Sequence, residues 1–240
     1  MILFFVIKKD SYMENSIYQF LVKYHGNWDK VYDAINEREK VSTDYSFRTS
    51  EKSIFIISDE YHDKFKKILM PPFYTFYKGD IQFLDKNVIG IVGKISNNEL
   101  DKIIKSNSES VICFNNNDFT NNNYDLLISK EVKFIVICEG SINTFEYEWN
   151  KNILLISEYD NVEDYQPSLE QTVERLLYSI SDSIIAGYIE ICSWEKLAIN
   201  LKDDPKTIQV SDHQLKWLSE VSRNFNSYSN HIKVLSNMFN

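Results

Sequence analysis

The sequence predicts an α/β protein built on a Rossmann-like parallel sheet with helices on both faces. Short apolar runs rich in Val and Ile recur from residue 54 onward, and from Val88 onward most are separated by segments with helical periodicity. Continuous apolar runs are typical of strands that are buried on both faces. A helix between successive strands makes those strands parallel, and the crossovers are then right-handed.

The strands expected from these runs are Ile54–Ile57, Phe73–Tyr77, Val88–Val92, Val111–Phe114, Phe134–Cys138, Ile153–Ile156, Ile184–Ile191 and Thr207–Val210. The helices expected between them are Asn98–Lys105, Tyr124–Ser129, Leu169–Ile180 and Trp194–Leu201. Asn115–Asn123, rich in Asn, is expected to be a solvated loop. It follows a strand's carboxyl end, where open α/β sheets place ligands, so a polar site there is the alternative.

A small helical domain is expected over residues 1–50, before the sheet. An apolar stripe from Tyr18 to Tyr24 leads into the cap and turn His25-Gly26-Asn27, and a second helical stripe begins at Trp28. The polar residues 40–53 suggest a connection. The Rossmann-like domain is assigned to 51–211, and 212–240 is expected to form a helical tail.

Charge and hydropathy restrict the function. The chain has 26 Lys and Arg against 35 Asp and Glu, a net charge of -9 and a pI near 5.0. A general basic footprint for nucleic acid is therefore missing, and a nucleic-acid site must be a local patch. The apolar N-terminus is only seven residues long before Lys8, too short for a signal peptide, and no run is long enough to span a membrane. A cytoplasmic protein is expected.

Residues that carry chemistry in enzymes show no catalytic or metal-binding pattern. The three cysteines (Cys113, Cys138 and Cys192) are widely spaced among apolar neighbours and are expected to be reduced core thiols. The four histidines have no ligand spacing, so neither a metal nor a cofactor is expected. There is no G-x-S-x-G elbow and no Cys–His pair in context, so the chain is not expected to be an enzyme.

One candidate for anion binding is the turn Gly93-Lys94-Ile95-Ser96, which follows the expected strand Val88–Val92. A glycine between the first strand of such a sheet and a helix is where backbone N–H groups cradle phosphate, and Lys94 adds positive charge. The full G-x-G-x-x-G motif is absent. The alternative is a tight turn in which Ser96 is the helix N-cap.

A second candidate is the aromatic run Phe73–Tyr77, which two prolines precede and Lys78 follows. Aromatic side chains beside a lysine can stack on bases. The alternative is an ordinary core strand, because aromatic residues contribute most to burial.

Several of these segments together resemble the DNA-processing protein A (DprA/Smf) family. The similar segments are Asp59-Glu60-Tyr61, Pro71-Pro72-Phe73, Phe76-Tyr77-Lys78-Gly79-Asp80, Val88–Gly93, Leu155-Ile156-Ser157-Glu158-Tyr159 and Glu174–Asp182. Their order and spacing also fit, and the N-terminal helices are similar to the small helical (SAM-like) domain of some members.

Three departures from the family pattern indicate a diverged member. Gly93-Lys94-Ile95 stands where the family has Gly-Ser-Arg. Asn115–Asn123 replaces a glycine-rich Ser-Gly-Gly-Ala-x-Gly-Ile-Asp stretch, and of the family's Arg-Asn-Arg only Arg175 remains.

The resemblance implies single-stranded DNA binding in DNA processing and recombination, including DNA uptake, loading of a RecA-type recombinase and homodimerisation. The residues expected to contact DNA or phosphate are Gly93, Lys94, Ser96, Arg175 and Lys78. The alternative is a diverged scaffold that has lost DNA binding and acts through protein contacts. A phosphoribohydrolase-like or other nucleotide-binding function would need a Pro-Gly-Gly-x-Gly-Thr loop, which the sequence does not contain.

Overall fold

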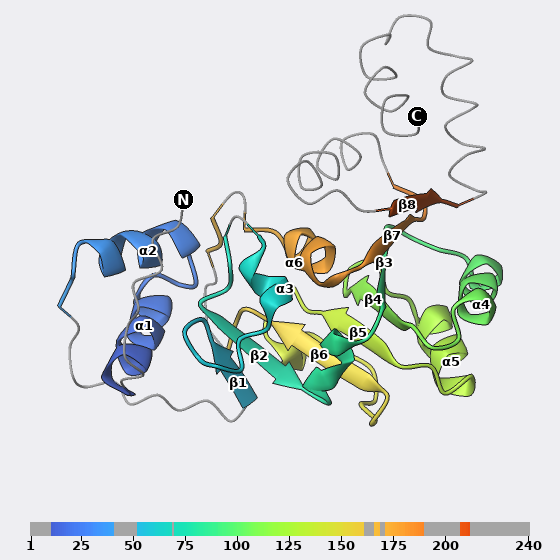
Figure 1. Cartoon of the computed structure of the whole chain (residues 1–240), viewed down its shortest axis with the longest axis horizontal. Helices are drawn as coiled ribbons and strands as arrows, with labels where there is room; N and C mark the ends of the chain where they lie inside the picture. Colours follow the sequence, from blue (N-terminus) through green and yellow to red (C-terminus); the bar gives the residue numbers. More distant parts are fainter. Residues whose placement is uncertain are drawn as a thin grey trace, which may run out of the picture.

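The structure is a computed structural model that describes residues 11–40, 52–68, 70–160, 166–168, 171–189 and 207–211. Expected features that lie outside these residues are Cys192, the helix Trp194–Leu201 and the tail 212–240. In the described part the chain forms one eight-stranded sheet with helices on both faces (Figure 1). The α/β, Rossmann-like prediction is therefore confirmed.

The strand order is β1-β2-β6-β5-β4-β3-β7-β8. The strands are β1 Lys52–Phe55, β2 Tyr74–Lys78, β3 Val88–Val92, β4 Val111–Asn115, β5 Phe134–Ile137, β6 Ile153–Ser157, β7 Ser183–Ala186 and β8 Thr207–Val210. Neighbouring strands from β6 to β8 are parallel, whereas β1 pairs antiparallel with β2 and β2 antiparallel with β6. All residues of β3, β4, β5 and β6 are buried, which explains their continuous apolar sequence.

Two hydrophobic cores lie on opposite faces of this sheet. On one face pack α3 (Asp63–Lys66), α6 (Val173–Ile180) and the 3₁₀ turn η1 (Ile81–Asp85). On the other face pack α4 (Asn97–Ser106), α5 (Asn121–Ser129) and the 3₁₀ turn η2 (Ile142–Thr144). Cys113 and Cys138 are free and buried in this sheet, as predicted, and burial raises the pKa of Cys138 to about 12.

The N-terminal helices α1 (Ser11–Lys23) and α2 (Trp28–Asn36) join through the turn that the sequence predicts. His25 and Gly26 have positive φ, and the Asn27 side chain caps α2 by accepting the backbone N–H of Lys30. The two helices share a core with the aromatic residues of β1 and β2. The domain boundary near residue 50 stays a prediction, although the packing continues across it.

Helix α5 begins earlier than predicted, because the Asn-rich segment contains its own cap. Thr120 is the N-cap, and its hydroxyl and the Asn123 side chain form a capping box. Of the predicted loop Asn115–Asn123, only residues 116–120 form a loop, because Asn115 ends β4 and α5 begins at Asn121. The strand predicted at Ile184–Ile191 is also shorter, since β7 ends at Ala186, and α6 begins at Val173 rather than Leu169.

Candidate functional site

The site lies where the chain changes direction across the sheet. From β3 the chain adds β4, β5 and β6 on one side, and β7 then returns to the other side of β3. The gap between the carboxyl ends of β3 and β7 is thus the topological switch point, where open α/β sheets bind ligands. The turn that begins at Gly93 follows β3, and Gly187-Tyr188 follows β7.

Two glycines allow the chain to turn at this point. Gly93 has φ +77°, and a Cβ there would lie 2.1 Å from Ile189 Cγ2 and 2.5 Å from the Tyr188 carbonyl oxygen. A Cβ on Gly187 would lie 2.4 Å from the Lys94 carbonyl oxygen. Only glycine lets the two backbone turns approach this closely.

Beyond the glycines, Lys94 and Tyr188 form an isolated antiparallel bridge. The Lys94 N–H donates to the Tyr188 carbonyl at 3.1 Å, and the Tyr188 N–H donates to the Lys94 carbonyl at 2.7 Å. Directly opposed residues in such a pair project their side chains on the same side, with Cβ atoms about 5 Å apart. Both side chains are exposed, Tyr188 by 38%. An amine and an aromatic ring therefore stand together at the switch point.

The remaining polar groups of the turn are held within the protein. Ser96 caps α4 in a full capping box with Glu99, which confirms the helix-cap interpretation of Ser96. The Gly93 N–H donates to Asp118 Oδ2 at 3.0 Å. A contact of Gly93 or Ser96 with phosphate stays a prediction.

Asp118 lies in the loop between β4 and α5, and its backbone hydrogen bond and the burial of the next residue fix its position. Its backbone N–H donates to the Asn115 carbonyl at 3.1 Å, and the next residue, Phe119, is buried against Phe114 and Phe134. Burial raises the pKa of Asp118, and the negative charge of Glu174 adds to this. The hydrogen bond from Gly93 and the charge of Lys94 act in the opposite direction and favour the carboxylate.

Arg175 lies in α6 but is buried, with its guanidinium in an ion pair. The side chains of Arg175 and Glu158 are each 5% exposed, and Arg175 Nη1 donates to Glu158 Oε2 at 2.7 Å while Nη2 bonds Glu158 Oε1. The remaining N–H groups donate to the Met70 carbonyl and, at 2.9 Å, to the Thr172 carbonyl. All five donors are thus used inside the protein. We therefore do not include Arg175 among the residues proposed to contact DNA.

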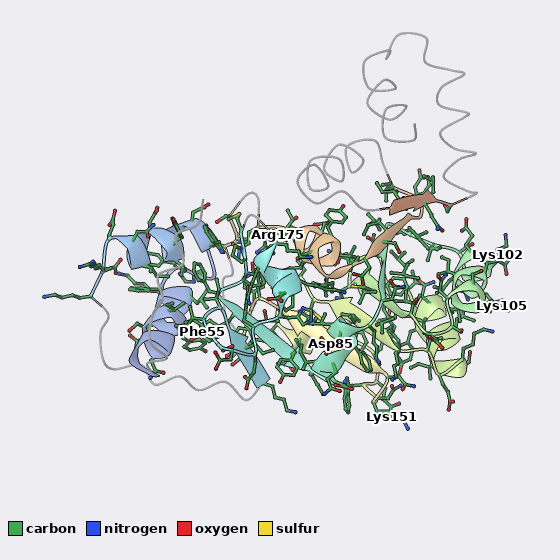
Figure 2. The ribbon with its side chains drawn as sticks, viewed as in Figure 1. Phe55, Asp85, Lys102, Lys105, Lys151 and Arg175 are labelled. Carbon is green, nitrogen blue, oxygen red and sulfur yellow. The ribbon has the colours of Figure 1, made fainter. Side chains whose placement is uncertain are left out.

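Lys78 does not lie at the switch point with Lys94. Because β2 runs antiparallel to β6, its last residue, Lys78, pairs with Leu155 in the middle of β6, and the chain there leads away from the carboxyl ends of the parallel strands. There Lys78 Nζ lies 5.3 Å from the ring centroid of Trp149, which is 39% exposed. Exposed Lys151 (Figure 2) lies two residues before β6, at the amino end of that strand. The aromatic residues of β2 itself are mainly buried, as the core-strand alternative predicts.

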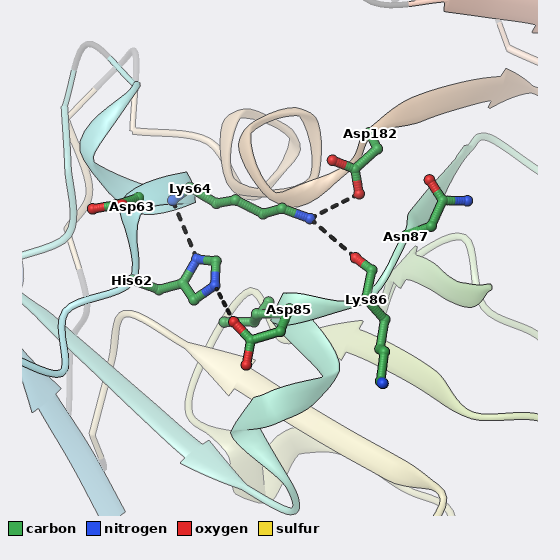
Figure 3. Close-up of a pocket in the computed structure, with 8 residues that line it drawn as sticks. His62, Asp63, Lys64, Asp85, Lys86, Asn87 and Asp182 are labelled. Carbon is green, nitrogen blue, oxygen red and sulfur yellow. Dashed lines mark hydrogen bonds and ion pairs between the residues drawn. The ribbon is translucent and has the colours of Figure 1, made fainter. Parts of the chain in front are cut away.

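A separate pocket of about 480 Å³ lies near the amino end of β3 (Figure 3). His62 Nδ1 accepts the Lys64 backbone N–H, so the neutral ring carries its hydrogen on Nε2, 3.2 Å from Asp85 Oδ1. Lys64 Nζ bonds Asp182 Oδ2 at 2.8 Å, and the same carboxylate oxygen accepts the Val88 N–H. These pairs join α3, η1 and the start of β3 and β7, which indicates a structural role.

Sequence reasoning missed Tyr188 and Asp118. Because the apolar run continues to Ile191, it does not indicate where β7 ends, although Gly187 directly follows the last residue of that strand. Asp118 lies inside a segment whose composition is that of a loop.

Among the residues that the structure describes, no helix is long and apolar enough to cross a membrane. No cluster of three His, Cys, Asp or Glu side chains among these residues is placed to hold a metal ion.

Comparison with known proteins supports the fold. No family model and no curated protein matches the sequence. Among solved structures, the chain is similar to DNA processing protein A from Streptococcus pneumoniae, with a TM-score of 0.54 and 17% identity over 80% of this chain and 75% of that chain. It is also similar to DNA processing protein A from Helicobacter pylori, described for its single-stranded DNA binding mode, with a TM-score of 0.50 and 17% identity over 78% of this chain and 97% of that one. The chain therefore has the DprA fold that its motifs predicted.

Proposed function

We propose that this protein binds single-stranded DNA as a DprA-like DNA-processing protein, and that Lys94 and Tyr188 form the centre of the site. The observation that carries the proposal is the exposed Lys94–Tyr188 pair at the switch point of a fold shared with a DprA protein described as binding single-stranded DNA. A lysine beside an exposed ring supplies what single-strand binding requires, a cation for the phosphate and a face for the base.

Tyr188 is better placed for this role than the other exposed large aromatic residues of the described part. Tyr32 stacks on Trp28 with ring centroids 5.0 Å apart, within the helical pair. Trp149 lies at the opposite edge of the sheet, with Lys78 over its ring. Tyr188 alone among the three lies at the switch point.

The test is fluorescence anisotropy of a labelled oligo-dT strand at low and moderate salt. Tyr188→Ala is expected to weaken binding about 5-fold to 150-fold, because stacking contributes ~1–3 kcal/mol per base. Lys94→Ala is expected to lower the slope of log affinity against log salt by about 0.7, one phosphate contact on a single strand. Lys151→Ala removes the same charge at the other edge of the sheet and serves as the control. Equal losses in all three variants, or no binding at low salt, would refute the proposal.

A second candidate function is a scaffold that acts through protein contacts without DNA. The charge at the strand ends favours it, because Asp118 and Glu139 lie on loops, and Glu174 in the first turn of α6, at the edge where Lys94 would meet phosphate. A RecA-type recombinase and a second copy of the chain are the partners proposed in either case. Light scattering of the purified chain, alone and mixed with a recombinase, measures both associations without DNA.

A further inference from the structure

The Gly93 N–H lies in the turn after the first parallel strand, where Rossmann-like sheets bring backbone donors to a phosphate, and in this chain a carboxylate already accepts its hydrogen bond. Asp118 Oδ2 accepts that N–H at 3.0 Å, and the charge of Asp118 interacts with that of Lys94. The loop fixes the carboxylate in this position, since Phe119 is buried directly after it and Asn115 accepts its backbone N–H. The Asp118 carboxylate thus takes the place of a bound anion at the Gly93 N–H.

We infer that Asp118 excludes phosphate dianions from the switch-point site, so that free phosphate and phosphomonoesters are rejected while a phosphodiester strand is tolerated. The part that concerns DNA rests on the proposed function. A dianion near Asp118 meets twice the repulsion that a singly charged diester meets, because Coulomb energy is proportional to charge. A DNA strand also gains affinity by stacking on Tyr188, whereas inorganic phosphate has no base to stack.

The different exposure of Lys94 and Asp118 also explains why a DNA strand is tolerated and a terminal phosphate is not. Lys94 is exposed, whereas Asp118 is half-buried and bonded to the Gly93 N–H. A strand that passes over the outer side of the turn contacts Lys94 without displacing Asp118. A terminal phosphate that enters the turn must compete with Asp118 for the Gly93 N–H.

The experiment titrates inorganic phosphate, then oligo-dT, into the full chain and into Asp118→Asn, with calorimetry for phosphate and anisotropy for DNA. The asparagine side chain has almost the same shape as aspartate and can still accept the Gly93 N–H, so the variant removes the charge and keeps that hydrogen bond, while the other oxygen becomes an NH₂ donor. Phosphate affinity is expected to rise at least about tenfold. Oligo-dT affinity is expected to rise about threefold, since the fold-change for a single charge is the square root of that for two.

Glu139→Gln is the matched control, because Glu139 is an exposed carboxylate at the same edge that bonds Asn117 and not Gly93. Equal gains in phosphate affinity in Glu139→Gln and Asp118→Asn would overturn the inference, as would no gain in Asp118→Asn. Asp118→Ser repeats the test if thermal melting shows that Asp118→Asn is unfolded. A wild-type chain that binds no oligo-dT, together with phosphate binding by Asp118→Asn, would refute the proposed function and uphold the exclusion of dianions.

Discussion

Removing Glu158 is expected to destabilise this protein strongly, because it leaves the Arg175 guanidinium charged and unpaired in the interior. Glu158 and Arg175 are each 5% exposed in their side chains, and the pair links the end of β6 to α6. Glu158→Gln keeps the size of the side chain but turns one acceptor oxygen into an N–H donor that faces the guanidinium. Breaking a buried pair from one side costs about 3–5 kcal/mol.

The assay is urea and thermal unfolding followed by tryptophan fluorescence. For a chain of this size, each kcal/mol corresponds to about 2–4 °C in Tm, so Glu158→Gln is expected to melt about 6–20 °C lower. Asp63→Asn is the control, because the ion pair of Asp63 with Lys66 is exposed and its loss is expected to change the Tm little. The double variant Glu158→Leu with Arg175→Met replaces the pair by apolar groups and is expected to recover most of the loss.

Two results would refute this reasoning. A loss below about 1 kcal/mol in Glu158→Gln would mean that the pair is solvated. A double variant that folds normally but no longer binds oligo-dT would mean that Arg175 contacts DNA, as the sequence suggested, and that its hydrogen bonds to Glu158 and Met70 open on binding.

Three further outcomes follow from the turn and its neighbours. Gly93→Ala is expected to lose at least about 1–2 kcal/mol in urea unfolding, because φ there is +77° and the new Cβ would overlap Ile189; an unchanged midpoint would contradict the turn geometry. Ser96→Ala is expected to lose about 1 kcal/mol with the capping box and to keep its oligo-dT affinity; a loss of affinity at constant stability would instead favour a phosphate contact. Because burial raises the pKa of Asp118, the folded state binds its proton more tightly than the unfolded state, so this group's contribution makes stability fall as pH rises from about 4 through the raised pKa. Asp118→Asn is therefore expected to raise the urea midpoint at pH 7.5 more than at pH 4, and an equal shift at both would contradict this.

Much of the fold could be predicted because its central strands are buried on both faces. Val88–Val92 has five buried residues and no polar side chain, and a run this short between Asn87 and Gly93 indicates a strand. The antiparallel pairing of β2 with β6 could not be predicted, because it depends on a partner far along the chain. Local patterns likewise do not report whether β2 lies at an edge or inside a sheet.

The candidate site was predicted less completely than the fold, and each of its residues has its own physical reason. Lys94 followed from its place after the first parallel strand, and the structure puts it at the switch point. Arg175 was expected to contact DNA because it is what remains of the family's Arg-Asn-Arg, but its partner Glu158 lies 17 residues earlier and only folding brings the two together. Tyr188 gains its position from a two-residue bridge to Lys94, which no periodicity encodes.

Photocrosslinking tests the central claim most directly. An oligo-dT strand that carries 5-iododeoxyuridine is irradiated with the protein, and the modified peptides are identified by mass spectrometry. If Lys94 and Tyr188 form the site, Tyr188 is expected to be the main crosslinked residue, and Lys94→Ala is expected to reduce the yield. Crosslinks at Trp149 or Tyr32 with none at Tyr188 would place the strand elsewhere and contradict the account.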